Sequence, residues 1–436
     1  MEMDIKEISK KVSSSSLFKD SFWAVFGNGL GHFLLLLSGI IIARFLGKDI
    51  YGEYGVVKTT MFYIASFSTL GLGFTATRFV ARYNDTDNAL LKGSIISSII
   101  ITTISSAVLC FFLFIFSVPL ANYLGEPGLS TPFRFLGIII IAKALSTTTG
   151  AILGGTKNFK AVGINNIISG VCMLAMGVGF TYFWGLKGSL VALLSSQLIL
   201  CILNFFAISK KTLAKLVNVE GQPQYGPLLK FTFPVALQEL SYALAQWGVV
   251  MLLTKYSSLG EVGLYSAAAQ WNAIILFMPS LLSNVVLSYL SGSTDKQQIK
   301  ILRLMLLVNF ISTLFPFIIV YIFSDFITSF YGSTFVGMKD VMNILVFSTI
   351  FDCMSKVFQS NMISKGKNWV LFSYRTIRDI TLLALTFFVL YHSTGENGAT
   401  KYALMSLFVS IGYFILLLLD YLLTHKERGI IKADNN

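Results

Sequence analysis

The feature that most constrains this chain is a succession of about twelve long apolar runs separated by short polar loops. Such runs of about 20 residues match the thickness of a bilayer, and lipid offers the backbone no hydrogen bonds, so each spanning segment must be a helix or part of a closed barrel. Barrel strands would show strict alternation over about 10 residues, which this sequence lacks. With 12% charged residues and a mean hydropathy of +0.73, the sequence predicts an all-α integral membrane protein.

The apolar runs, bounded by charges and turn residues, predict twelve transmembrane helices in two six-helix lobes. The spans are expected near residues 20–43, 53–75, 92–117, 132–153, 161–183, 187–208, 230–254, 263–290, 301–323, 340–362, 368–391 and 401–424. The N-terminal lobe is expected over 20–208 and the C-terminal lobe over 230–424, with a tail at 1–19, a linker at 209–229 and a second tail at 425–436. The linker is the longest connection, so no loop could house a soluble catalytic domain.

The distribution of Lys and Arg predicts the orientation in the membrane. With the amino terminus in the cytoplasm, the tails and cytoplasmic loops hold 21 of the 33 basic residues, and the outer loops, with Lys58 counted among them, hold 8. The positive-inside rule therefore favours cytoplasmic amino and carboxyl termini. The net charge of +12 needs no nucleic-acid partner, because the cations are spread over short loops between apolar runs.

The two halves of the chain resemble each other. Residues 43–54 align without a gap to residues 254–265, at an offset of 211, so that Gly52 pairs with Gly263 and Tyr54 with Tyr265. Six spans in each half give both repeats the same orientation, related by an axis along the membrane normal. The sequence therefore predicts a parallel repeat of two lobes with a cleft between them.

Four basic residues fall within the predicted spans, where a charge costs about 2.5 to 3.5 kcal/mol and usually faces a partner or a water-filled cavity. They are Lys143, Lys356, Arg375 and Arg378. Asp352 and Lys356 are four residues apart, as are Arg375 and Asp379, so each pair can meet on its own helix. Together with Arg378 these charges sum to +1. They are either internal salt bridges or a cationic surface that faces the cleft and attracts phosphate.

Lys143 stands alone in the fourth span, with no acid within four residues. Its ammonium either faces the cavity or has a structural role, because the position is too deep for the side chain to reach an interface. Arg44 and Lys255 occupy matched repeat positions at the outer ends of spans one and seven. These two residues are either interfacial anchors or part of the cationic path.

Four titratable groups are candidates for coupling transport to H⁺ or Na⁺. Glu239 follows Pro234, which interrupts a helical hydrogen bond and can free carbonyl oxygens. A satisfied polar contact is the alternative interpretation for Glu239. Asp352 and Asp379 are the other intramembrane carboxylates, and an internal salt bridge is the alternative for both. His32 is either a proton-responsive group or a hydrogen-bonded packing residue.

No motif of catalysis or cofactor binding is present in the sequence. It contains no HExxH, GxSxG or P-loop and no Cys/His spacing for a metal. A GxGxG run from Gly27 to Gly31 precedes no βαβ unit, so both glycines are predicted to be close-packing positions in a helix. We therefore expect a protein that is not an enzyme, with no cofactor and no metal.

Three stretches near the amino terminus carry a family resemblance: Leu37–Gly47 (LSGIIIARFLG), Tyr51–Gly55 (YGEYG) and Leu70–Gly73 (LGLG). They resemble the start of bacterial polysaccharide-biosynthesis proteins, the O-antigen or repeat-unit flippases of the MATE-like (MOP) superfamily. The resemblance implies a V-shaped bundle of two six-helix lobes around a central cavity, in the inner membrane, alternating between inward-open and outward-open states.

The resemblance also implies a cargo, an undecaprenyl-pyrophosphate-linked oligosaccharide whose lipid tail stays in the bilayer. The other expected partners are membrane lipids and the polysaccharide polymerase and chain-length regulator of the same pathway. Cationic cavity residues engage the anionic cargo in related flippases, which fits Lys143, Arg375 and Arg378 by type. Two alternatives stay open: a MATE-type cation or drug antiporter, whose cavity should be lined by acids, and an integral-membrane polysaccharide polymerase.

Overall fold

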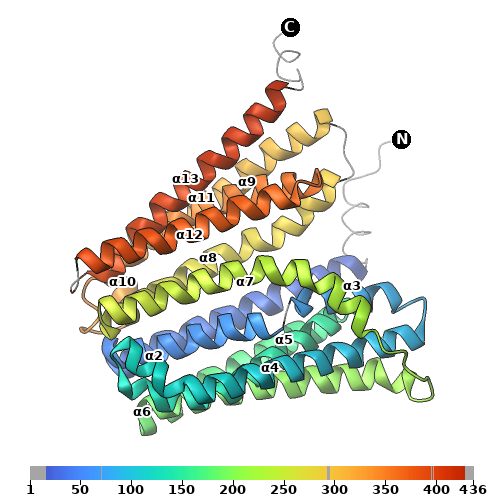
Figure 1. The fold of residues 1–436 in the computed structure, drawn as a ribbon, viewed down its shortest axis with the longest axis horizontal. Coiled ribbons are helices and arrows are strands. Elements are labelled where there is room, and N and C mark those ends of the chain that lie inside the picture. Colours follow the sequence, from blue (N-terminus) through green and yellow to red (C-terminus); the bar gives the residue numbers. More distant parts are fainter. Residues whose placement is uncertain (1–15, 70, 292–294, 394, 396, 428–436) are drawn as a thin grey trace. The chain divides into compact units, whose positions relative to one another are not determined.

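The structure is a computed structural model that describes residues 16–427 apart from residues 70, 292–294, 394 and 396. All regular elements in the described ranges are helical (Figure 1). In chain order they are α2 (Ser16–Ser68), α3 (Leu72–Tyr83), α4 (Asn88–Leu124), η1 (Pro127–Leu129), α5 (Ser130–Gly155), α6 (Phe159–Lys211), η2 (Leu213–Leu216), α7 (Tyr225–Tyr256), α8 (Leu259–Ser291), α9 (Asp295–Ile322), α10 (Ser324–Ser329), α11 (Met338–Ser364), α12 (Asn368–His392) and α13 (Gly398–Glu427).

Long apolar helices make this a multi-pass membrane protein. Seven segments of the described chain are long and apolar enough to cross a membrane: those that contain α2, α4, α5, α6, α9, α11 and α13. Helices satisfy their own backbone hydrogen bonds, which is what lipid requires. The prediction of an all-α integral membrane protein is confirmed, whereas the number of twelve spans stays a prediction.

The two longest helices are each broken by a glycine. α2 and α6 both run for 53 residues, and each contains one non-helical residue, Gly47 (φ 72°, ψ 168°) in α2 and Gly185 (φ 57°, ψ −133°) in α6. Both conformations are open to glycine because it has no Cβ. The breaks fall between the predicted spans one and two and between spans five and six. The second predicted span runs too far, because α2 ends at Ser68 and α3 starts at Leu72.

The chain divides into two compact units, and the first comprises Met1–Leu46 and Glu53–Trp247. Within it α5 packs against α3, α4 and α6. A Cβ on Gly27 of α2 would collide with the backbone of Gly163 in α6, and one on Gly31 would lie 3.1 Å from the carbonyl oxygen of Asn166. The predicted close-packing role of both glycines is confirmed. The apolar cluster at the α3, α4, α5 and α6 contacts contains Ala76, Val80, Leu91, Ile95, Ile152, Leu153, Ile208 and Leu216.

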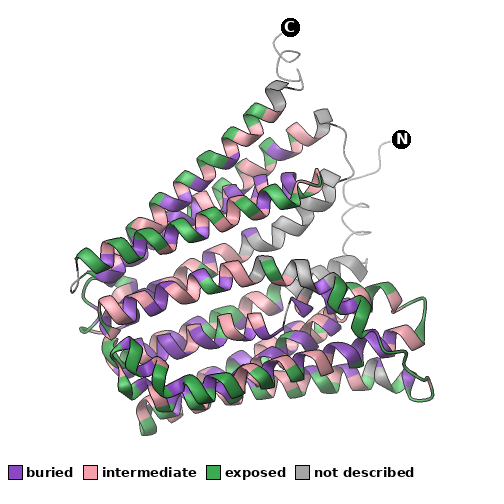
Figure 2. Ribbon diagram, viewed as in Figure 1, coloured by how far each residue is buried: buried purple, intermediate pink, exposed green. Residues whose placement is uncertain are grey.

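The second compact unit comprises Gly47–Gly52 and Gly248–Asn436. Its centre is α11, which contacts α8, α9, α12 and α13. α12 and α13 carry many exposed side chains (Figure 2), including the apolar Ile377, Phe388 and Phe408. The apolar cluster that joins α9, α11, α12 and α13 contains Leu302, Val357, Phe358, Met362, Leu371, Tyr413 and Leu417. The domain limits expected from the sequence stay a prediction.

The repeat-matched glycines meet inside the second unit. A Cβ on Gly52 would collide with the carbonyl oxygen of Leu259, and one on Gly263 with the carbonyl oxygen of Lys48. Lys48 and Leu259 are themselves separated by the offset of 211 residues that pairs the two glycines. The two contacts are therefore reciprocal: each glycine meets the residue that is matched, in the repeat, to the one met by the other glycine.

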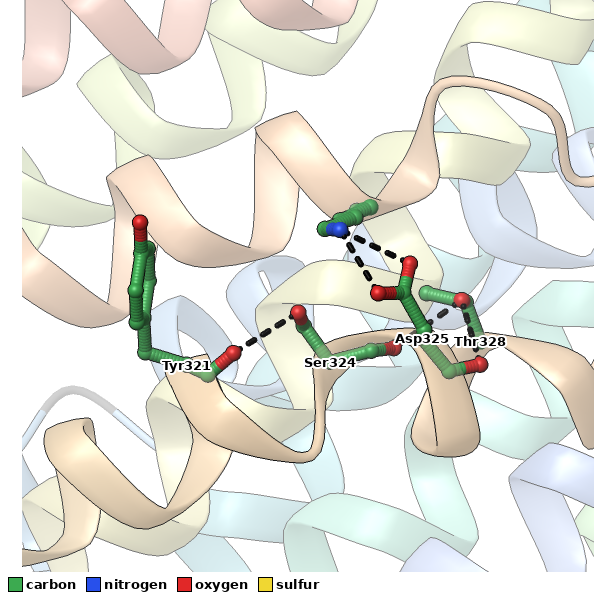
Figure 3. A network of polar contacts seen from close by, with 5 residues as sticks. Tyr321, Ser324, Asp325 and Thr328 are labelled. Atoms are coloured by element: carbon green, nitrogen blue, oxygen red, sulfur yellow. Dashed lines mark hydrogen bonds and ion pairs between the residues drawn. The ribbon is translucent and has the colours of Figure 1, made fainter.

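An exposed ion pair connects the short helix α10 to the start of α11. Lys339 Nζ lies 2.8 Å from both carboxylate oxygens of Asp325. Figure 3 shows Asp325 beside Ser324 and Thr328, whose hydroxyls donate to the carbonyl oxygens of Tyr321 at 2.8 Å and Ser324 at 2.9 Å. The side chains of Lys339 and Asp325 are 44% and 80% exposed, so water screens their attraction.

Candidate functional site

Lys143 is the central candidate in the first unit. It lies in the middle of α5 and is half-buried. The hydroxyls of Ser146 and Thr147 each donate to its carbonyl oxygen at 2.9 Å, so the backbone satisfies them. None of the salt bridges found among the described residues includes Lys143. His32 of α2 lies within electrostatic reach of its ammonium.

Buried polar side chains fix the position of α5 against α6. Asn165 donates to Asn204 Oδ1 at 2.9 Å, and Asn204 donates to the carbonyl oxygen of Ser146 at 3.2 Å. The Ser146 hydroxyl lies 3.3 Å from Gln197 Oε1, to which it donates. Paired polar groups of this kind specify one arrangement of the helices. Lys143, one turn from Ser146, is thereby held in a defined orientation. Sequence reasoning missed these residues because neutral amides carry no charge to distinguish them.

Lys58 is an intramembrane cation that the sequence analysis assigned to an outer loop. The structure places it 11 residues after the break at Gly47, or about 16 Å along the helix. It is half-buried, with Nζ 5.9 Å from the ring centre of Tyr54. Lys58 takes part in no salt bridge within the described part of the chain. Counting Lys58 with the outer loops conflicts with the expected second span, 53–75, because Lys58 lies five residues inside that apolar run.

In the second unit, α11, α12 and α13 bring several charges together. Arg378 donates to one carboxylate oxygen of Asp379, from Nε at 2.9 Å and from Nη2 at 2.6 Å. The two side chains are 17% and 3% exposed. Asp352 accepts a hydrogen bond from the Ser410 hydroxyl at 2.8 Å and lies within electrostatic reach of Arg378 and Lys356. Charged side chains of α11 and α12 therefore act on one another within the second unit.

The pairing within this cluster differs from the one expected. Asp379 pairs with its neighbour Arg378, and no salt bridge among the described residues joins it to Arg375, four residues away. The spacing allowed an Arg375–Asp379 pair as one of two alternatives, and the described partner of Asp379 is Arg378 instead. The reason is tertiary: the Arg378 guanidinium lies over the ring of Tyr413 in α13, 5.0 Å from its centre, and from there it reaches the adjacent carboxylate.

A cavity of about 330 Å³ lies beside the cluster, between α12 and α13. Ile377, Leu385, Phe408 and Leu416 contribute apolar parts of its wall, and Arg378 and Tyr413 are among its polar members. All the lining residues belong to the second unit. A charged group in a mainly apolar wall is an arrangement suited to an amphiphilic anion.

Three further residues were predicted to belong to the site: Arg44, Lys255 and Glu239. Arg44 is exposed near the end of the first part of α2. Lys255 is in the last turn of α7, with Nζ 5.6 Å from the ring centre of Tyr256. The side chain of Glu239 lies outside the described residues. A place for these three in a transport path stays a prediction.

Several of these cations are suited to binding an anion. Lys58 and Lys143 present ammonium groups in a low-dielectric region, where a charge attracts an anion more strongly than it does in water. Arg378 presents a planar guanidinium, which matches the geometry of phosphate oxygens.

Comparisons with known proteins connect these features to polysaccharide export. The model of a family described as polysaccharide biosynthesis protein matches residues 17–293. A putative O-antigen transporter of Shigella flexneri is 23% identical over 425 residues, which cover 94% of this chain and 96% of that protein. The succinoglycan biosynthesis transport protein ExoT of Rhizobium meliloti is 21% identical over 271 residues, which cover 60% of this chain and 51% of that protein.

Solved structures show the same fold at low sequence identity. An inward-facing multidrug resistance MATE family transporter of the MOP superfamily superposes with a TM-score of 0.77 at 13% identity, covering 89% of this chain and 94% of that one. The lipid II flippase MurJ in an inward closed conformation gives a TM-score of 0.72 at 16% identity, covering 92% of this chain and 87% of that one. The MATE-like fold expected from the resemblance is confirmed.

Proposed function

Because the chain belongs to the polysaccharide biosynthesis protein family, we propose that it is a flippase for undecaprenyl-pyrophosphate-linked oligosaccharide repeat units. It moves the repeat units of O-antigen or another surface polysaccharide from the cytoplasmic to the outer leaflet by alternating access. The observation that carries this proposal is the similarity to the O-antigen transporter, which extends over 94% of this chain and 96% of that protein. Relatives with this degree of coverage are named as transporters, and we assign transport, not catalysis, to this chain.

Intramembrane cations supply the attraction for the pyrophosphate of the cargo. A lysine in an apolar helix without a carboxylate partner raises the free energy of the protein in the membrane, because its charge is poorly solvated. A bound anion offsets this cost. Lys58 and Lys143 meet this description in the first unit, since neither takes part in a salt bridge among the described residues. In the second unit the cargo-facing candidates are Arg378, Arg375 and Lys356. Arg44 and Lys255 complete the proposed path at the outer ends of their helices.

The proposed topology is twelve crossings in two six-helix lobes of parallel orientation, in a bacterial inner membrane with both termini in the cytoplasm. A 53-residue helix is about 80 Å long, against a hydrocarbon core of about 30 Å. Each of α2 and α6 therefore supplies two crossings that meet at its glycine break. Together with α4, α5, α7, α8, α9, α11, α12 and α13, they give the twelve crossings of the proposal.

Transport is coupled to H⁺ or Na⁺ without a cofactor in this proposal. The candidate coupling groups are Asp352, Asp379, Glu239 and His32. Asp352 is the strongest of them, because its one described hydrogen bond comes from a neutral hydroxyl, whereas Asp379 is neutralised by Arg378. A polysaccharide polymerase and a chain-length regulator are the expected protein partners.

Translocation of a lipid-linked oligosaccharide by purified protein in liposomes tests the proposal. The wild type should move undecaprenyl-pyrophosphate-linked oligosaccharide between leaflets under an imposed ion gradient. Lys143→Ala combined with Arg378→Ala should lower the rate by about tenfold or more, since each removed cation contributes a charge-assisted contact to the pyrophosphate. Lys339→Ala, which removes an exposed cation that is not among the proposed cargo-binding residues, is the control and should transport normally. A wild type that leaves every matched cargo in its original leaflet would refute the flippase function.

A MATE-type cation antiporter is the second candidate. The observation that favours it is the presence of three intramembrane carboxylates, Glu239, Asp352 and Asp379, of which Asp379 is already paired with a cation. Ion-driven efflux of an organic cation from the same liposomes, without movement of the lipid-linked sugar, would establish it. A polymerase is less suited to the short connections of this chain, and growth of glycan length by the purified protein would be its test.

A further inference from the structure

One residue that lines the cavity between α12 and α13 has a polar group whose bonding is incomplete. Tyr413 forms part of its wall and is 4% exposed. Its hydroxyl is buried and has no hydrogen-bond partner among the described residues. A buried hydroxyl without a partner bears the full cost of its desolvation, so such groups call for an explanation. A ligand with an acceptor oxygen would provide one.

The charges around this hydroxyl favour an anion. Arg378, Arg375, Asp379 and Asp352 all lie within its electrostatic reach. With Lys356, which is within reach of Asp352, the cluster carries three positive and two negative charges, a sum of +1. Arg378 is oriented by its bonds to Asp379 and by the Tyr413 ring, so its guanidinium is already positioned at the cavity wall.

The position along the helix identifies the kind of anion. Arg378 is ten residues from the start of α12 and fourteen from its end, or about 15 and 21 Å along the axis. It therefore lies near the middle of a hydrocarbon core about 30 Å thick. A resting phospholipid keeps its phosphate at the interface, and a free phosphate gains nothing from apolar walls. A lipid-linked phosphate that crosses the membrane must pass this depth with its hydrocarbon chain beside it.

We infer that the cavity between α12 and α13 is a transit site for the prenyl-linked phosphate of the cargo. Arg378 and the Tyr413 hydroxyl bind phosphoryl oxygens, while Ile377, Leu385 and Phe408 pack against the adjoining isoprene units. The volume of about 330 Å³ lies within the usual range for ligand pockets, about 300 to 1,000 Å³. The inference rests on the proposed function and deepens it, since it assigns the junction of lipid and phosphate to a site within the second unit.

Gly412 allows the cavity to be filled selectively. It lines the cavity, and a Cβ at this position would meet no atom within 4 Å. Gly412→Leu therefore places its side chain in the cavity with little disturbance of the helix. Gly179 in α6 is equally unobstructed and lies in the other unit, so Gly179→Leu is the matched control. Tyr413→Phe is a second, milder variant that removes a single hydroxyl.

Binding of radiolabelled undecaprenyl phosphate to the full-length protein in nanodiscs of neutral lipid is the measurement. Gly412→Leu should abolish saturable binding, and Tyr413→Phe should weaken it about tenfold, as expected for the loss of one hydrogen bond to a charged group. Gly179→Leu should bind as the wild type does, and phosphatidylglycerol or inorganic phosphate should not displace the probe. Wild-type binding in both Gly412→Leu and Tyr413→Phe, or equal displacement by phosphatidylglycerol, would overturn the inference.

The translocation assay separates this inference from the proposed function. If the wild type moves lipid-linked oligosaccharide and Gly412→Leu binds undecaprenyl phosphate normally, the flippase proposal stands and the transit site is refuted. If Gly412→Leu abolishes binding but the wild type moves no cargo, binding of a prenyl phosphate in this cavity is supported, while its role in transit is refuted together with the flippase proposal.

Discussion

Neutralising Asp379 should destabilise the second unit strongly, because it leaves the Arg378 guanidinium buried without its counter-ion. The Asp379 carboxylate accepts both described bonds of Arg378, at 2.9 and 2.6 Å. With side chains only 17% and 3% exposed, water cannot replace the lost carboxylate. Breaking a buried ion pair on one side costs about 3 to 5 kcal/mol. Asp352 is within electrostatic reach of Arg378 and offsets part of this loss, so we expect Asp379→Asn to cost about 3 kcal/mol.

A double-mutant cycle separates the pair from its surroundings. Asp379→Asn, Arg378→Met and the double variant would be unfolded reversibly in mixed micelles, with helix content followed by circular dichroism. The double variant should be less destabilised than the sum of the single ones, with a coupling free energy of about 2 kcal/mol. This expectation follows from burial, because Arg378→Met removes the buried guanidinium whose bonds to the Asp379 carboxylate are lost in Asp379→Asn.

The exposed Lys339–Asp325 pair is the matched control for this cycle. Its closest contact of 2.8 Å is similar to the 2.6 Å of the buried pair, but its side chains are 44% and 80% exposed. The same cycle there should give no measurable coupling, since water and salt screen the interaction. Equal coupling in the two pairs would show that burial does not decide the strength of the Arg378–Asp379 interaction, and the reasoning above would be wrong.

Other variants test separate contacts. Gly52→Ala and Gly263→Ala should each lower the free energy of unfolding by about 1 to 3 kcal/mol, because a Cβ at either position collides with a backbone carbonyl oxygen; an unchanged melting temperature would contradict the reciprocal contact. Lys92→Met should expose the 213–219 segment to protease, since the Lys92 ammonium donates to the carbonyl oxygens of Leu216 at 3.0 Å and Val219 at 2.8 Å; equal cleavage of variant and wild type would count against it. Lys58→Met should reduce transport of lipid-linked oligosaccharide about tenfold without lowering the melting temperature, and a stable variant with normal transport would remove Lys58 from the cargo path.

The fold class could be predicted from sequence because lipid acts on each segment separately. Residues 93–117 contain no charged residue, and in lipid such a run has to be a helix wherever its neighbours lie. The repeat offset of 211 residues likewise pairs Gly52 with Gly263 from the sequence alone. Charges inside apolar runs were recognisable for the same reason, since burial in lipid makes each of them costly in its own right.

The contacts among those charges were decided only by the tertiary structure. Spacing along α12 favoured Arg375 as the partner of Asp379, but the ring of Tyr413 on α13 lies under the Arg378 guanidinium, and Arg378 makes the pair. The cavity beside Arg378 depends equally on how α12 and α13 face each other. Sequence by itself therefore determined which segments are helices in lipid and, apart from Lys58, which charges need an explanation. The partners of those charges depend on the rotation and depth of each helix against its neighbours, and these are set by packing between residues far apart in the chain.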